Sequence, residues 1–193
     1  MRTENRFDPV FDCQQVFKAL MNALAQPGKV FSIEENVKRL GGNGAPFKAV
    51  ALTLLDNWRS FYVEGDPALA EELRELTYGV PAPLEEADYL FFPRMGEPGP
   101  VIEKAKPGTL PEPHKSATLF LLTDSLTGGE AFSLTGPGVE GAVTVTLPAP
   151  CRAWLEERQA QAFEFPCGVD LYFLTPQGQV MGIPRKVKIG GEG

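Results

Sequence analysis

The chain has 193 residues, 43% of them apolar, and 25 acidic against 18 basic side chains give a net charge of -7. This length suits one sizeable core, so we expect a single domain over 1–193. The negative charge argues against broad binding to nucleic acid or to anionic membranes, although it still allows a local anion site. The lack of a secretory leader or of an apolar run long enough to cross a bilayer predicts a cytoplasmic protein.

The first half of the chain predicts three helices and three short strands. Apolar side chains recur at helical spacing over 11–25, where Asp12 is the expected N-cap and Gln26-Pro27-Gly28 ends the helix. A second helix is apolar almost throughout, and a third is polar, with Asp66 as its cap and Pro67 in its first turn. These helices cover 47–55 and 67–77, and the strands cover 29–33, 60–63 and 89–92. The glycine-rich segment 34–45 predicts a loop.

The second half predicts a long loop followed by strands. The loop covers 93–115, with one or two helical turns around 101–106, and a loop of that length is usually functional or held by a partner. Strands are expected over 117–123, 131–135 and 142–147, and an amphipathic helix over 150–162. Helices at both ends and strands between them indicate a mixed sheet with helices on both faces. The tail 190–193 is expected to be disordered.

The stretch from 165 to 185 is the clearest part of the pattern. A near-continuous apolar run up to Leu174 is typical of a strand buried on both faces, and a turn at 175–178 leads into a second apolar run. Asp170 opens the first strand and Arg185 follows the second, so antiparallel pairing would place both charges at one end of the sheet. Such a pair is either a structural ion pair or the floor of an anion site, and the sequence leaves both open.

Glycines and charges that interrupt the apolar strands suggest where a ligand would bind. The run Leu134-Thr135-Gly136-Pro137-Gly138 is either a tight turn or a loop that offers backbone amides to a phosphate, although it lacks the Lys-Ser/Thr of a P-loop. The guanidinium of Arg185 would pair with a phosphate or phosphonate oxygen. The ligand-binding hypothesis names six residues: Asp56, Thr135, Gly136, Gly138, Asp170 and Arg185.

Other chemistry finds little support in the sequence. His114 is the only histidine, and no Gly-x-Ser-x-Gly elbow is present for a serine hydrolase. Scattered cysteines without a Cys-x-x-Cys spacing suggest neither disulfides nor a metal cluster, so no metal site is expected. One further alternative is a pyridoxal phosphate enzyme in which Lys115 forms the Schiff base and Asp170 faces the pyridinium nitrogen.

Six stretches, in order along nearly the whole chain, resemble the PhnH subunit family of the bacterial carbon–phosphorus lyase system. They are Phe7-Asp8-Pro9-Val10-Phe11 running on to Ala25-Gln26-Pro27-Gly28, Leu52-Thr53-Leu54-Leu55-Asp56, Lys115-Ser116-Ala117-Thr118, Leu134-Thr135-Gly136-Pro137-Gly138-Val139, Phe165-Pro166-Cys167-Gly168-Val169-Asp170-Leu171 and Ile183-Pro184-Arg185. One departure is that PhnH chains commonly follow Pro-Arg with two threonines, where this chain has Lys186-Val187.

The resemblance implies a three-layer α/β/α fold with a mixed, mainly parallel seven-stranded sheet, like a reduced large domain of the pyridoxal phosphate transferases without the cofactor. It also implies a homodimer that joins PhnG, PhnI and PhnJ in a core complex. That complex forms ribose 1-alkylphosphonate 5-triphosphate from ATP and an alkylphosphonate. A PhnH-like chain is required there without an assigned catalytic role, so an assembly or ligand-binding role is expected.

Two other classes of function stay open at this point. The first is a purely structural interaction module without a ligand, whose partner contacts would lie on the loop 93–115 or on exposed sheet edges. The second is the free-standing pyridoxal phosphate enzyme using Lys115. The length of the chain argues against the second, because cofactor enzymes of that fold carry an additional domain.

Overall fold

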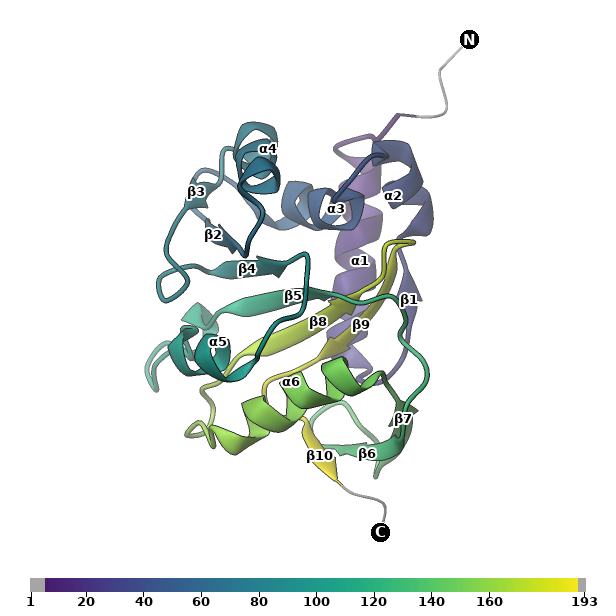
Figure 1. Ribbon diagram of the computed structural model, residues 1–193, viewed down its shortest axis with the longest axis vertical. Helices are drawn as coiled ribbons and strands as arrows, with labels where there is room; N and C mark the ends of the chain where they lie inside the picture. Colours follow the sequence, from purple (N-terminus) through teal and green to yellow (C-terminus); the bar gives the residue numbers. More distant parts are fainter. Residues whose placement is uncertain (1–5, 191–193) are drawn as a thin grey trace.

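A seven-stranded sheet forms the centre of the computed structural model, which describes residues 6–190 (Figure 1). Its strand order is β1-β9-β8-β5-β4-β2-β3. The run from β3 to β8 is parallel, whereas β9 is antiparallel to both β8 and β1. The strands are β1 (Phe31–Ser32), β2 (Ser60–Val63), β3 (Val80–Pro81), β4 (Tyr89–Phe92), β5 (Thr118–Leu122), β8 (Asp170–Leu174) and β9 (Gln179–Ile183). The expected mixed, mainly parallel sheet is confirmed.

Helices cover both faces of this sheet (Figure 1). The first four pack with one cluster of buried side chains, and the other two pack with a second cluster on the opposite face. The first group is α1 (Phe11–Ala25), α2 (Glu34–Leu40), α3 (Ala45–Leu54) and α4 (Pro67–Thr77); the second is α5 (Gly99–Lys104) and α6 (Ala149–Ala160). Every residue of β8 is buried, because its alternate side chains enter the two clusters. This burial on both faces explains the near-continuous apolar run in the sequence.

A separate three-stranded antiparallel sheet lies beside α6 (Figure 1). It consists of β6 (Ala131–Thr135), β7 (Val143–Thr146) and β10 (Lys188–Gly190), in the order β10-β6-β7. The sequence predicted β6 and β7 as strands but not that they would leave the main sheet. Gly190, expected in a disordered tail, instead pairs with Ser133. The remainder of that tail, 191–193, lies outside the described residues.

The N-terminal region corrects two predictions. Asp12 is not the N-cap: the N-cap position of α1 is Val10, and the Oδ1 of Asp8 accepts hydrogen bonds from the backbone N–H groups of Val10 and Phe11 in the turn that leads into the helix. Asp12 lies inside the helix, fully buried, and pairs with Arg39. The prediction of a loop over 34–45 was wrong for its first part, because residues 34–40 form α2; Gly41, with a φ of 63°, directly follows the helix.

The long predicted loop also contains more structure than expected. Besides α5, it ends in a 3₁₀ turn, η1 (Pro113–Lys115). The helix predicted over 67–77 is confirmed, with Asp66 accepting from the N–H of Leu69 as its cap. Over residues 6–190 no helix is long and apolar enough to cross a membrane.

Candidate functional site

The amino-terminal edge of the parallel strands carries a buried ion pair. Arg185 follows β9 and its Nη2 lies 2.5 Å from Oδ2 of Asp170, the first residue of β8. The same carboxylate also accepts from the backbone N–H of Arg185 at 2.7 Å and from its Nε at 3.2 Å. The hairpin therefore brings the two charges to one end of the sheet, as predicted, and there they form the ion pair that was one of the two alternatives.

This pair also holds the long loop in place. Nη1 of Arg185 donates to the carbonyl of Pro113 at the start of η1. A second contact to the same loop is the hydrogen bond from the backbone N–H of Gly168 to the carbonyl of Pro107. The side chains of Asp170 and Arg185 are only 12% and 22% exposed. Arg185 is thus largely engaged within the protein, and an anion-binding role for it stays a prediction.

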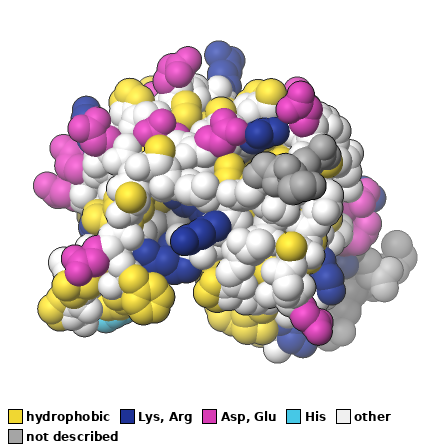
Figure 2. Space-filling view, turned by 90° about the horizontal axis from the view of Figure 1, so that it is seen from below, with side chains coloured by type: hydrophobic (Ala, Val, Ile, Leu, Met, Phe, Trp, Pro, Cys, Tyr) yellow, Lys and Arg dark blue, Asp and Glu magenta, His cyan; other side chains and the backbone are white. Residues whose placement is uncertain are grey.

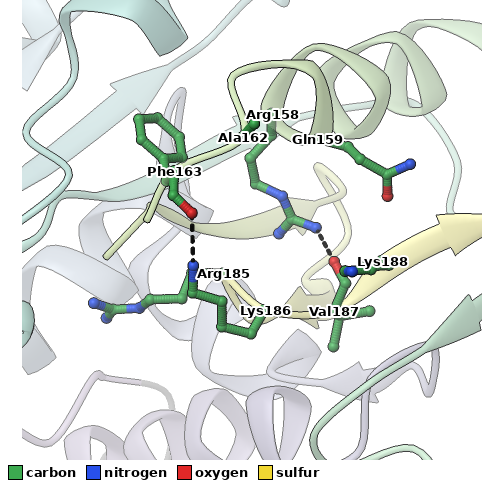
Figure 3. A pocket seen from close by; sticks show the side chains of 8 residues that line it. All are labelled: Arg158, Gln159, Ala162, Phe163, Arg185, Lys186, Val187 and Lys188. Atoms are coloured by element: carbon green, nitrogen blue, oxygen red, sulfur yellow. Dashed lines mark hydrogen bonds between the residues drawn. The ribbon is translucent and has the colours of Figure 1, made fainter. Parts of the chain in front are cut away.

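Next to this pair lies a small pocket between the C-terminal turn of α6 and the segment Arg185–Lys188, which we call the cationic segment (Figure 3). Four positively charged side chains line the pocket and no acidic one does. They are Arg158, Arg185, Lys186 and Lys188. Figure 3 shows the guanidinium of Arg158 pointing from α6 toward the segment, while that of Arg185 points away from it.

Arg158 is the residue that the sequence analysis missed. It is only 4% exposed, and its guanidinium donates to the carbonyls of Ile183 (3.0 Å), Pro184 (3.0 Å) and Val187 (2.6 Å). Burial lowers its pKa to about 10, against a smaller opposing effect of Asp170. A signal was available, because the buried stripe of α6 includes Cys151, Trp154, Leu155 and Arg158 at helical spacing.

Lys186 is another of the residues that line the pocket. Its Nζ donates to the carbonyls of Phe163 at 3.2 Å and Glu164 at 3.4 Å, and it stands 5.7 Å from the ring centre of Phe165. Burial is the largest cause that lowers its pKa, and the neighbouring cations Arg185, Arg158 and Lys188 lower it further against a raising effect of Cys167. Burial, with a smaller contribution from the neighbouring cations, therefore disfavours the charged form of Lys186.

Thr135 and Gly136 lie beside this segment, as the hypothesis of converging strand ends suggested. Thr135 pairs with Lys188 across the small sheet. Gly136 has a φ of 124°, and a Cβ there would meet the carbonyl oxygen of Lys186 at 2.8 Å. Gly138 packs instead against α1, where a Cβ would lie 3.0 Å from the carbonyl oxygen of Ala25.

Asp56 is placed differently. It follows α3, and its Oδ1 accepts from the N–H of Trp58. It lines a separate concavity with Asn57 and Tyr78, in which none of the other five candidate residues takes part.

A wider concavity of about 410 Å³ adjoins the cationic pocket and shares Arg185 and Lys186 with it. Its other walls come from Asp170, which pairs with Arg185, from His114 and from four prolines: Pro113, Pro137, Pro166 and Pro184. Figure 2 shows this face with Lys and Arg side chains gathered in a hollow between two lobes, one of which carries the histidine. Lys115 is not among the lining residues; it is 60% exposed and pairs with Glu112 at 2.7 Å.

Comparison with known proteins agrees with the resemblance in the sequence. The family model described as "Bacterial phosphonate metabolism protein (PhnH)" matches residues 5–190. A Rhizobium meliloti protein named "Alpha-D-ribose 1-methylphosphonate 5-triphosphate synthase subunit PhnH" is 29% identical over 191 residues, covering 96% of this chain and 94% of the relative. The Stutzerimonas stutzeri "Putative C-P lyase subunit protein HtxG" is 28% identical over 186 residues, covering 93% and 87%. The chain therefore belongs to the PhnH family of bacterial phosphonate metabolism proteins.

Proposed function

We propose that this chain is a subunit of the carbon–phosphorus lyase core complex, in which it joins PhnG, PhnI and PhnJ in the cytoplasm. There it supports the formation of ribose 1-alkylphosphonate 5-triphosphate from ATP and an alkylphosphonate. The observation that carries this proposal is the family match over 5–190, together with a relative named as a subunit of that synthase and aligned over 94% of its length.

The chemistry of the candidate site favours assembly or ligand binding over catalysis. Asp170 and Arg185 neutralise each other and hold the loop, so neither carries the free charge expected of an acid or base. Arg158 donates to three backbone carbonyls and so orders the cationic segment. These residues therefore mainly set the shape and the electrostatic potential of the surface around the cationic pocket.

Exposed apolar side chains support membership in a complex. Phe17 and Met21 stand one turn apart on α1 and are 52% and 51% exposed. Trp58, in the turn after α3, and Tyr78, directly after α4, are 84% and 79% exposed, and both residue types are enriched in protein interfaces. Surfaces of this kind are common where one subunit meets another.

We also propose a homodimer and a single folded unit, both following from the family resemblance. The seven-stranded sheet with helices on both faces suits a reduced large domain of the pyridoxal phosphate transferases. A catalytic Lys115 gains no support, because that side chain lies in η1 and pairs with Glu112.

The experiment is co-expression of the tagged chain with PhnG, PhnI and PhnJ from its own source, followed by size-exclusion chromatography and mass measurement of the complex. We expect one peak that contains all four chains. A variant carrying Phe17→Glu and Trp58→Glu introduces charge on the exposed apolar positions and is expected to lower recovery, whereas Lys18→Glu on the same helix serves as the matched control. A chain that elutes alone in every combination would overturn the proposal.

A ligand-free structural module is the second candidate. The engagement of Arg185 with Asp170 and with the carbonyl of Pro113 favours it, because this removes the guanidinium that the sequence analysis offered to an anion. The two candidates differ in whether the neighbouring cationic pocket binds anything.

A further inference from the structure

We propose that the pocket between α6 and the cationic segment is an oxyanion site, which holds the phosphate or phosphonate group of a small organic anion. Lys186 and Lys188 would supply ammonium groups to its oxygens, with Arg158 behind them. The assignment of the anion to phosphonate chemistry rests on the proposed function, whereas the site itself rests on the geometry below.

The first support is an imbalance of charge. Four cations line the pocket in a protein with a net charge of -7. Asp170 neutralises Arg185, and within residues 6–190 no carboxylate lies within 4.0 Å of the charged groups of the other three. A concave surface that gathers like charges focuses a positive potential, which attracts small anions.

The second support is the buried charge of Arg158. Its three acceptors are neutral carbonyls, and no hydrogen bond of its Nε is found among the described residues. A guanidinium has five N–H donors, so this one still has donors to offer. A buried cation without a counter-charge is costly, and a bound anion beside it would supply the missing charge.

The size of the two concavities defines the ligand class. The cationic pocket has a volume of about 100 Å³, space for roughly three waters at about 30 Å³ each, which suits one tetrahedral oxyanion group and is too small for a nucleobase. The adjoining concavity is larger, and half of its lining residues are prolines; it shares Arg185 and Lys186 with the pocket, and its one acidic residue, Asp170, is paired with Arg185. An organic substituent would lie there, against the prolines and His114.

Two sources of such an anion share this chemistry, namely an alkylphosphonate and the end of a polyphosphate chain. The test is isothermal titration calorimetry on the full chain with methylphosphonate, inorganic phosphate and ATP without metal, each at low and high ionic strength. The site variant is Lys186→Gln with Lys188→Gln, and the control is Lys18→Gln with Lys104→Gln, two exposed lysines on α1 and α5.

We expect at least one of the three anions to bind with a Kd below roughly 10 mM, and more weakly at high salt. The site variant should weaken binding by about tenfold or more, since each lysine offers a charge-assisted hydrogen bond, and the control should not. Preference for methylphosphonate or for ATP would distinguish the two sources. Absence of binding by all three, or equal binding by the site variant, would overturn the site.

The outcome is separable from that of the proposed function. The site variant keeps the apolar surfaces on α1 and near Trp58, so it should still co-elute with PhnG, PhnI and PhnJ. If the wild-type chain assembles with its partners but does not bind anions, only the proposed oxyanion site is refuted. If the chain binds anions but does not assemble with its partners, only the proposed membership in the complex is refuted.

Discussion

Replacement of Arg185 by methionine tests whether the ion pair at the strand edge is structural. The substitution keeps most of the apolar stem but removes the guanidinium, which leaves the Asp170 carboxylate with only the backbone N–H of residue 185 among the partners on that segment. Breaking a buried ion pair costs about 3–5 kcal/mol. Because the two side chains are 22% and 12% exposed, water offsets part of that cost and we expect about 3 kcal/mol.

For a chain of this length about 1 kcal/mol corresponds to roughly 2–4 °C, so the midpoint of thermal unfolding should fall by roughly 6–12 °C, measured by circular dichroism. The matched control is Lys115→Met, whose exposed pair with Glu112 should contribute less than about 1 kcal/mol. Adding Asp170→Asn to Arg185→Met removes the stranded charge, so the double variant should lose less stability than the sum of the single changes. If the Arg185→Met variant unfolded at the same temperature as the wild type, the ion pair would not be structural.

Three further predictions concern packing and titration. Gly182→Ala places a Cβ about 2.8 Å from backbone atoms of α1, so we expect a loss of about 1–3 kcal/mol in urea unfolding. The hydrogen bond to Glu64, then burial, raise the pKa of Tyr62 to about 12, so stability from this contact is lost as the pH rises from about 10 to about 12. Glu64→Gln should return the pKa of Tyr62 toward 10, followed by tyrosinate absorbance. Burial raises the pKa of Asp88, but the hydrogen bonds and charge of Lys106 and the contacts with Ser60 outweigh burial, so the pKa is lowered overall. The ionised carboxylate therefore stabilises the fold at pH values above the ordinary pKa of aspartate, and this stabilisation is lost as the pH falls through the lowered pKa. Lys106→Met should flatten this acid dependence of the unfolding free energy.

Local signals in the sequence predicted the elements that depend on local structure. The helix over 67–77 was predicted with its bounds because Asp66 and Pro67 mark its start. The short helix α2 was not, because the N-cap position is Ile33 without a side-chain hydrogen bond and glycines follow directly. The two-residue strand β3 contains Pro81, and its place at the sheet edge comes only from pairing with β2.

The candidate site followed the same division. Asp170 and Arg185 stand on one hairpin, so counting from its turn was enough to place them together. The small sheet joins β6 and β10, which are more than fifty residues apart, and so it brings Thr135 to Lys188 by a pairing that no local pattern contains. Arg158 was visible in principle as a charge on the buried stripe of α6, but its three carbonyl acceptors come from a distant turn.

The most direct test of the account is growth of the source bacterium after deletion of the gene for this chain, with methylphosphonate as the only phosphorus source. A subunit required for phosphonate use predicts no growth on methylphosphonate, normal growth on phosphate, and recovery of growth when the wild-type chain is returned. Equal growth of the deletion strain and its parent on methylphosphonate would contradict the account.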